Sequence, residues 1–275
     1  MRIGYIGVGK WATQLRDAFE ARGHETVWHA RSDANSLNWV CKPKEGWGPI
    51  RRFNTGNMPD YHEQDLIVCT CPPGPLHYYA GLFSGVPMLV TKPFDLERLE
   101  EDDLTRYAPT YVDLWRVLTP EWEAFKERFN AIERDGTIGV AIDFKGRGPF
   151  RQWVSGAMDH APHAMAYLLD MFLALVQSKL TWSMSNGLDG MYAEYNVLLG
   201  KASAEAGNNS DKKRRGVTVH YYSQDGEEHY LEFGEPNKSA GLAKLVGHCE
   251  TGNTYTWELN KRVMHELRNV PWVVR

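Results

Sequence analysis

The chain has 275 residues, of which 43% are hydrophobic and 24% charged, so it can form one large domain or two of ordinary size. Its formal net charge of −4 argues against a dedicated binder of nucleic acid or anionic membranes, because such proteins carry a basic excess. No apolar run reaches the ~20 residues of a membrane-spanning helix, and we expect no secretory leader.

The four cysteines do not suggest a disulfide framework in a chain of this length. Cys69 and Cys71 form a C-x-C pair near the end of an apolar run, while Cys41 and Cys249 are isolated. No set of Cys and His residues has the spacing of a zinc site, so we predict buried strand cysteines and no metal centre. This cysteine usage favours the reducing cytosol, and we expect a cytoplasmic protein.

The amino terminus combines a short apolar strand, a glycine turn and an amphipathic helix over residues 11–22. In that context Gly7 permits a tight turn, Gly9 lets the backbone approach a pyrophosphate, and Ala12 keeps the helix near the strand. The free N–H groups at the helix start attract phosphate charge. The pattern predicts a dinucleotide site formed by Gly7, Gly9, Lys10, Trp11 and Ala12.

The first half of the chain alternates strands and helices. We predict helices at residues 76–83 and 96–104, and further strands at residues 25–29, 65–71, 87–90 and 111–115. Repeated βαβ units of this kind form a parallel sheet with right-handed crossovers. Residues 32–64 are less regular, and we favour a loop region with solvated charges. Alternatively, some of its cations (Lys42, Lys44, Arg51 and Arg52) border the adenosine end of a cofactor.

The pattern changes at Pro120. Helices are predicted at residues 121–134 and 163–175, and strands at residues 140–145, 191–199, 217–223, 229–233 and 254–259. The polar segment 206–215, which ends in four consecutive cations at residues 212–215, is interpreted as a solvated hairpin tip, with a phosphate-binding role as the less favoured alternative. We therefore predict an α/β protein with a Rossmann parallel-sheet domain over residues 1–118. An α+β domain with an open, largely antiparallel sheet follows over residues 119–275.

Three further segments resemble one family. Residues 65–73 with His77, followed by residues 85–93, resemble its D-x-V-x-x-x-x-P-P-x-x-x-H and G-K-x-V-x-x-E-K-P patterns. Residues 111–116 resemble its fifth strand, and residues 135–139 resemble the entry to its second domain. Residues 155–163 resemble its D-x-x-x-H motif. The chain thus resembles the Gfo/Idh/MocA family, named for glucose–fructose oxidoreductase and inositol dehydrogenase, over residues 1 to about 170.

The resemblance implies a catalytic set of Lys92, Asp159 and His163, and places Cys71, Pro72, His77 and Lys92 at the cofactor. Hydride transfer at an alcohol or carbonyl carbon needs a proton moved at the oxygen, which histidine can exchange near neutral pH. A lysine can stabilise negative charge on that oxygen. Asp159 lies four residues before His163, so one helix face carries both side chains if the helix begins this early. His160 could substitute for His163, but it sits one register off the motif.

Each of these residues, taken singly, has a simpler interpretation. His163 can be a structural hydrogen-bonding residue, Asp159 a helix N-cap, and Lys92 a solvated lysine at a strand end. Their joint occurrence at the family spacing, downstream of a nucleotide fingerprint, favours the catalytic interpretation. The chain departs from the family pattern at Thr91, where a glutamate is usual, and in a shortened connection after residue 94.

The end of the second strand bears on cofactor choice. An NAD site usually has an acidic residue there to hold the ribose hydroxyls, whereas this chain has Arg31 and Ser32. A planar cation and a hydroxyl suit a 2′-phosphate, so we predict a preference for NADP(H), with NAD(H) possible. A solvent-facing Arg31 with relaxed cofactor choice is the alternative.

The sequence says less about the substrate than about the cofactor. Trp115, Arg116 and Trp153, with Arg147 and Arg151, lie near the matched motifs and could line a pocket, although tryptophans in an apolar strand are usually core. We predict an NADP(H)-dependent oxidoreductase for a small-molecule sugar, polyol or related carbonyl or imine. The alternatives are a redox-neutral, NAD-retaining glycoside-cleaving enzyme and a non-catalytic nucleotide-binding scaffold. The resemblance also implies a homodimer or homotetramer assembled through the second-domain sheet.

Overall fold

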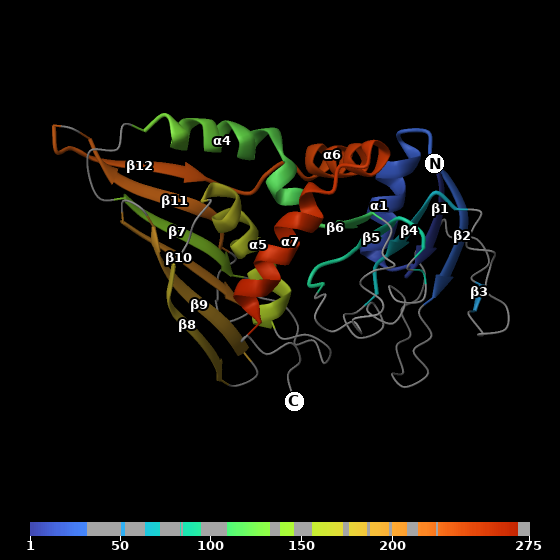
Figure 1. Ribbon diagram of the computed structural model, residues 1–275, viewed down its shortest axis with the longest axis horizontal. Helices are drawn as coiled ribbons and strands as arrows, with labels where there is room; N and C mark the ends of the chain where they lie inside the picture. The colour runs from blue at the N-terminus through green and yellow to red at the C-terminus, as the bar shows by residue number, and fades with distance from the viewer. Residues whose placement is uncertain are drawn as a thin grey trace. The chain divides into compact units, whose positions relative to one another are not determined.

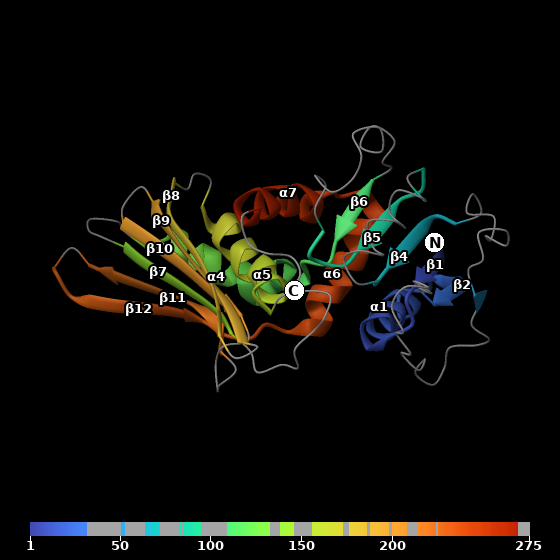
Figure 2. The ribbon, with the colours of Figure 1, turned by 90° about the horizontal axis from the view of Figure 1, so that it is seen from below.

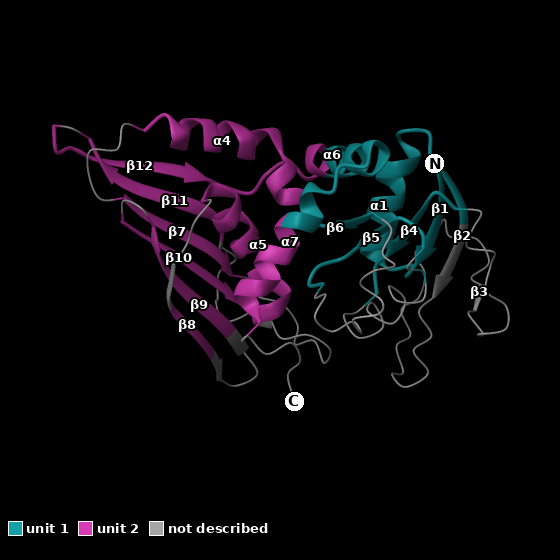
Figure 3. Cartoon of the chain, viewed as in Figure 1, with its two compact units in different colours: residues 1–113, 242–258 teal, residues 114–241, 259–275 magenta. Residues whose placement is uncertain are grey.

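The computed structural model describes residues 1–31, 51–52, 64–71, 83, 85–94, 109–132, 138–145, 156–172, 176–185, 188–197, 200–207, 214–223 and 225–268. The chain forms two compact units (Figure 3). The first comprises residues 1–113 and 242–258, and the second comprises residues 114–241 and 259–275.

The first unit contains a six-stranded sheet with the order β3-β2-β1-β4-β5-β6, and every strand pair in it is parallel (Figure 1). This is the strand order of a Rossmann fold, so the predicted fold class of the first domain is confirmed. The strands are β1 (Arg2–Ile6), β2 (Glu25–Arg31), β3 (Arg51–Arg52), β4 (Leu66–Cys69), β5 (Met88–Val90) and β6 (Thr110–Val112). The edge strand β3 falls in a segment for which we predicted no strand.

The burial of their residues explains why these segments form parallel strands. Every residue of β4, β5 and β6 is buried, as expected for parallel strands covered on both faces. The helix α1 (Lys10–Glu20) buries Ala12, Leu15 and Phe19 on one face, at the helical spacing seen in the sequence. The predicted strand, turn and helix at the amino terminus are therefore confirmed.

The predicted boundary at residues 118/119 differs from the observed units, because residues 242–258 return to the first unit. They belong to α6 (Lys238–Thr251) and α7 (Tyr255–Leu267). Glu250 accepts a hydrogen bond of 2.9 Å from Arg22 Nε and lies 2.8 Å from His24 Nε2. The backbone N–H of Val112 donates to Thr256 Oγ1 at 3.1 Å. These contacts join segments more than a hundred residues apart, which local sequence patterns do not reveal.

The predicted strand at residues 254–259 is wrong, because this segment begins α7. Its buried residues Leu259, Val263, Met264 and Leu267 follow helical spacing. The side chain of Asn253 accepts a hydrogen bond of 3.0 Å from the backbone N–H of Tyr255 and caps the first turn. The β-forming composition of Thr254, Tyr255 and Trp257 was therefore outweighed by the cap and by packing.

The second unit contains a six-stranded sheet with the order β12-β11-β7-β10-β9-β8. β7 and β10 pair in parallel and the other neighbours are antiparallel, so the predicted largely antiparallel sheet is confirmed. Neither β8 nor β10 was predicted, and β10 is rich in Ala and Gly, which form strands poorly without neighbours on both sides. The strands are β7 (Ile138–Lys145), β8 (Val176–Ser185), β9 (Leu188–Val197), β10 (Gly200–Gly207), β11 (Arg214–Tyr222) and β12 (Glu228–Phe233).

Two helices of this unit, α4 (Pro120–Asn130) and α5 (Gly156–Met171), lie on the same side of its sheet (Figure 2). α5 begins seven residues before the predicted start at His163. On β7 the side chains that face the helices are buried and alternate with more exposed ones. The predicted strand at 111–115 is shorter, because Trp115 opens the 3-10 helix η3 (Trp115–Leu118).

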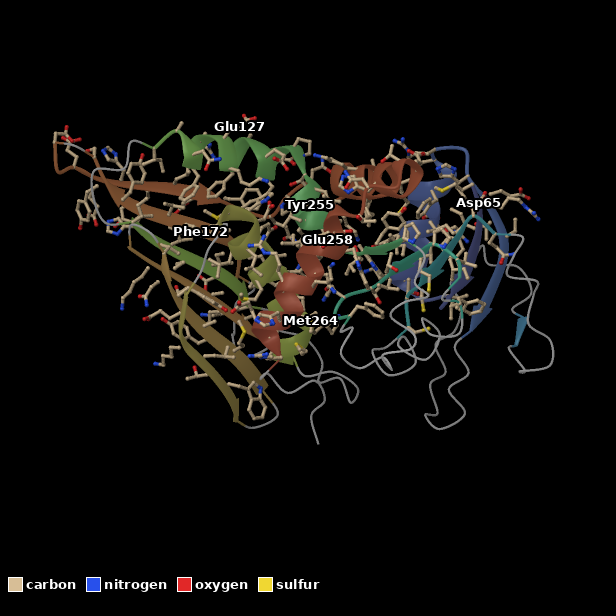
Figure 4. The ribbon with its side chains drawn as sticks, in the orientation of Figure 1. Asp65, Glu127, Phe172, Tyr255, Glu258 and Met264 are labelled. Carbon is tan, nitrogen blue, oxygen red and sulfur yellow. The ribbon has the colours of Figure 1, made fainter. Side chains whose placement is uncertain are left out.

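Trp122 of α4 lies at the centre of an aromatic cluster in the second unit. Its ring centroid is 5.3 Å from that of Phe125, 4.5 Å from Tyr167 and 5.0 Å from Phe233. Trp122 Nε1 also donates a hydrogen bond of 2.6 Å to Asp170 of α5. Figure 4 labels Glu127 on the opposite, exposed side of α4. α4 is therefore fixed to α5 and β12 by one buried side.

The described part of the chain contains no helix that is both long and apolar enough to cross a membrane.

Candidate functional site

The carboxyl ends of five parallel strands in the first unit lie in register. The aligned residues are Ile6, Ala30, Cys69, Val90 and Val112. The residues that follow them are Gly7, Arg31, Thr70, Thr91 and Asp113. The strand order changes direction between β1 and β4, and ligands of such sheets bind beyond the carboxyl ends at this position. The sheet therefore places Gly7 and Arg31, two of the predicted nucleotide-site residues, along one edge.

Gly7 is required at the turn after β1. Its φ is 100°, a left-handed conformation that disfavours side chains. A Cβ atom at Gly7 would lie 2.3 Å from Thr70 Oγ1, which is closer than any real contact. At Gly9 nothing lies within 4 Å of the corresponding point, so this side of the turn is open in the described part of the chain.

The amino terminus of α1 has the properties of an anion site. Gly9 is the N-cap, no side chain among the described residues caps the helix, and its first turn holds no acidic residue. The first-turn N–H groups of a helix have no partner within the helix and favour negative charge. In this turn Lys10 is exposed, Trp11 is half-buried and Ala12 is buried against the sheet.

Arg31 is the last residue of β2 and is paired in register with Arg52 of β3. The sheet thus brings two arginine positions side by side at its carboxyl edge. We had assigned one of them, Arg52, to a loop region with solvated charges.

Several predicted site residues lie outside the described part of the chain, and so do the predicted helices at 76–83 and 96–104. These residues are Ser32, Pro72, His77 and Trp153, with Lys42, Lys44, Arg147 and Arg151, and the isolated Cys41 also lies outside it.

Lys92 follows β5 at the same edge and is half-buried. Thr91, which stands in place of the family's glutamate, joins β5 to β4. Its N–H donates to the carbonyl of Cys69 at 3.2 Å, and its hydroxyl donates to the carbonyl of Cys71 at 3.5 Å. Thr91 thus fixes the backbone before Lys92 without placing a charge beside it.

The three predicted catalytic residues belong to different units. Lys92 lies in the first unit, and Asp159 and His163 lie in the second.

Cys69 and Cys71 are buried, as predicted, at and just after the end of β4. Burial raises the pKa of the Cys69 thiol well above its ordinary value, so the thiol stays protonated and is a poor nucleophile. Among the described residues no group of three or more His, Cys, Asp or Glu side chains is placed to hold a metal ion.

Asp159 and His163 both lie within α5. Because the helix begins at Gly156, Asp159 is a residue of the first turn and not the N-cap, so that alternative is wrong. Their spacing of four residues places the two side chains on one helix face. The His163 residue is 7% exposed, and its ring centroid lies 5.0 Å from that of Phe144 on β7. The helix thus presents Asp159 and His163 together beside the end of β7.

Arg116 belongs to η3 and is buried together with Trp115. Its guanidinium carbon lies 4.5 Å from the centroid of the Trp115 ring and 5.0 Å from that of Phe144. The face of Trp115 therefore holds a guanidinium inside the second unit.

Arg215 lies in a different place from the one that we favoured. We placed it in a solvated hairpin tip, whereas it lies in β11 directly opposite Phe144 of β7. Its guanidinium carbon is 5.2 Å from the Phe144 ring centroid, and its Nη1 donates to Glu235 Oε1 at 3.1 Å. The alternation of Arg215 with the buried residues Val217 and Val219 was the available signal, since alternate residues of a strand share a face.

Comparisons with known proteins agree with this architecture. No protein-family model and no curated protein matches the chain. A solved dehydrogenase from Chromobacterium violaceum has a TM-score of 0.70 at 16% identity, covering 97% of this chain and 93% of that one. The WlbA (WbpB) dehydrogenase from Thermus thermophilus, in complex with NAD and UDP-GlcNAcA, has a TM-score of 0.68 at 17% identity, covering 98% and 95%.

A third structure, UDP-N-acetylglucosamine 3-dehydrogenase GnnA from Acidithiobacillus ferrooxidans, has a TM-score of 0.69 at 14% identity and covers 98% of this chain and 96% of that chain. At such low identity the likeness establishes the fold alone. The chain has the two-domain fold of these dehydrogenases along nearly its whole length, which is the fold that the family resemblance implies.

Proposed function

We propose that this protein is an NAD(P)-dependent oxidoreductase acting on a sugar, a polyol or a related carbonyl or imine. The observation that carries the proposal is the edge of the first sheet, where the Gly7 turn and the uncapped start of α1 meet the strand-order switch. The solved structures with this fold that are named above are dehydrogenases, and one of them holds NAD with a sugar nucleotide.

The proposed catalytic residues are Lys92, Asp159 and His163. A bound nicotinamide would supply the hydride acceptor or donor. The imidazole of His163 then exchanges the proton of the substrate oxygen, and the ammonium group of Lys92 stabilises negative charge on that oxygen. Asp159, one helical turn from His163, orients the imidazole or binds a second substrate hydroxyl.

We further propose that the cofactor is NADP(H), with Arg31 and Ser32 at the 2′-phosphate. The support is the place of Arg31 at the carboxyl edge, next to the Gly7 turn and paired with Arg52. A planar guanidinium suits a phosphate, and no acidic residue occupies this strand end to hold ribose hydroxyls.

Replacing Arg31 by alanine is expected to weaken NADPH binding by about 10- to 100-fold and to leave NADH binding unchanged, as for the loss of a charge-assisted hydrogen bond. Calorimetric titration of the wild type and of Arg31→Ala with both nucleotides measures this. Arg128→Ala, which removes an exposed arginine of α4, is the matched control. Equal affinities for NADPH and NADH in both proteins would overturn the NADP(H) assignment.

Two other activities have distinct signatures. A redox-neutral enzyme that cleaves glycosides would retain NAD⁺ tightly and show no net change in nicotinamide absorbance on turnover. A scaffold would keep its biological activity in Lys92→Ala and His163→Ala. Absence of binding of either nucleotide, in protein shown to be free of carried-over ligand, would favour the scaffold.

We also propose that the protein forms a homo-oligomer through the outer face of the second sheet. The helices α4 and α5 cover the other face (Figure 2), while mostly small, polar and charged residues line the centre of this one. Ala141 of β7 is exposed there and pairs with Ser203 of β10 and Thr218 of β11. The shallow hollow around it is also lined by Gly139 and Tyr192.

Placing an arginine at this centre is expected to dissociate the oligomer, because a buried unpaired charge is costly at an interface. Sedimentation analysis should show the wild type as a dimer or tetramer and Ala141→Arg as a monomer with an unchanged circular dichroism spectrum. Ala124→Arg, on the exposed side of α4, is the control. A monomeric wild type, or an Ala141→Arg protein that remains assembled, would contradict the proposal.

A further inference from the structure

Two guanidinium groups and an imidazole surround one aromatic ring in the second unit. The ring of Phe144 has the guanidinium carbons of Arg116 and Arg215 at 5.0 and 5.2 Å from its centroid, and the ring centroid of His163 at 5.0 Å. The groups come from η3, β7, β11 and α5, which are far apart in the sequence. The fold therefore concentrates positive charge beside the proposed catalytic histidine.

Arg116 is buried with unused hydrogen-bonding capacity. Its side chain is 7% exposed and interacts with the Tyr167 hydroxyl, but its Nε and Nη1 atoms have no hydrogen-bond partner among the described residues. Its Nη2 makes a long contact of 3.4 Å with Glu235 Oε1. Burying a guanidinium costs free energy unless its donors are paired, so this arrangement calls for an additional acceptor.

Glu235 is shared between the two cations. The same oxygen, Oε1, accepts from Arg116 at 3.4 Å and from Arg215 at 3.1 Å. The Glu235 side chain is 46% exposed and the Arg215 side chain 24% exposed. Burial lowers the pKa of Arg215, the charge of Arg116 lowers it further, and Glu235 and Asp159 oppose this shift. The two like charges are therefore held together by acidic groups, of which Glu235 lies at the solvent side.

We propose that Arg116 and Arg215 bind an anionic substituent of the substrate, a carboxylate or a phosphate, and that Glu235 occupies this place in its absence. The substrate class is then a sugar acid or a sugar phosphate rather than a neutral sugar. This substrate assignment rests on the proposed oxidoreductase function, whereas anion binding by the two arginines does not.

The geometry supports an anion in this place. An incoming carboxylate or phosphate can place two oxygens in the plane of one guanidinium, whereas the two cations share a single oxygen, Oε1, of the Glu235 carboxylate. Glu235 comes from the connection between β12 and α6, outside any helix or strand, so its side chain can leave the cations without breaking an element. Because Phe144 joins the arginines to His163, a substrate held here by its anionic group presents its hydroxyls near the imidazole.

The test uses the whole chain labelled with ¹⁵N and follows the arginine Nε–Hε resonances by NMR. Sodium phosphate and sodium acetate are titrated at constant ionic strength against sodium chloride. We expect saturable shifts of the Arg116 and Arg215 resonances, assigned with the Arg215→Met variant. Glu235→Gln should bind the anions several-fold more tightly, because a competing carboxylate is gone, and Arg215→Met about tenfold or more weakly.

Matched controls are Glu232→Gln, which removes an exposed carboxylate of β12, and Arg128→Met. Circular dichroism verifies that each variant folds. If the ion pair is purely structural, Glu235→Gln gives no gain in anion affinity, because no anion then competes with its carboxylate. Shifts no larger than those with chloride, or Glu235→Gln binding no tighter than the wild type, would overturn the proposal.

The source of the anion is decided by a second titration with D-glucuronate, D-glucose 6-phosphate and neutral D-glucose. Tighter binding of the carboxylate or of the phosphate over glucose identifies the group, and equal binding of all three contradicts the substrate class. Nucleotide titration of the same samples separates the two proposals. Anion binding without nucleotide binding refutes only the oxidoreductase, and the reverse result refutes only the anion site.

Discussion

Replacing His163 by alanine is expected to lower turnover by about 10²- to 10⁴-fold while leaving nucleotide binding unchanged, as for the loss of a general acid or base. Lys92→Ala should have an effect of similar size, because the charge that develops on the substrate oxygen loses its stabilising cation. Turnover is followed by nicotinamide absorbance with the sugar, polyol or imine that the wild type uses.

Two controls separate these effects from general damage. His160→Ala removes a half-buried imidazole from the same helix, with its ring centroid 5.8 Å from that of Phe144, and should retain most activity. Lys244→Ala removes an exposed lysine of α6. Turnover in His163→Ala within a few-fold of the wild type would refute its proposed role, as would equal losses in His160→Ala.

Trp122→Ala is expected to reduce the free energy of unfolding by about 3–5 kcal/mol, the range for truncating a large buried aromatic side chain. Trp122 is fully buried against Phe125, Tyr167 and Phe233, and its removal also leaves Asp170 without the indole donor. Urea unfolding followed by circular dichroism gives the value.

Trp122→Phe keeps an aromatic ring and loses the hydrogen bond, so a smaller destabilisation of about 1–3 kcal/mol is expected. Trp182→Ala is the matched control, because that indole is exposed on β8 and should contribute less than about 1 kcal/mol. Equal destabilisation by Trp122→Ala and Trp182→Ala would show that the aromatic cluster does not carry the stability of this unit.

Local patterns predicted the parts of the site that are local in the sequence. The Gly7 turn follows from a strand, two glycines and a helix within twenty residues, and the pairing of Asp159 with His163 follows from their spacing. The parallel strands were visible because strands buried on both faces are almost continuously apolar. The register that aligns Ile6, Cys69 and Val90 then places the residues that follow them, Gly7, Thr70 and Thr91, along one edge without further information.

The features that we did not predict have a common physical cause, because each depends on contacts between segments far apart in the sequence. The composition of β10 is that of a poor strand, and the strand exists because β7 and β9 flank it. Arg215 was interpreted as one of a run of exposed cations, and only its register opposite Phe144 shows that it is partly buried. The return of residues 242–258 to the first unit depends on Glu250 and Thr256 contacts with residues far away in the sequence.

In the proposed function, the first unit binds a nicotinamide dinucleotide for hydride transfer. Calorimetric titration of the purified chain, first shown to be free of carried-over ligand, with NADPH and then NADH tests it most directly. We expect saturable binding of one nucleotide per chain, with NADPH bound more tightly. Absence of heat and of saturation with both nucleotides would contradict it and leave a non-catalytic protein with a dehydrogenase fold.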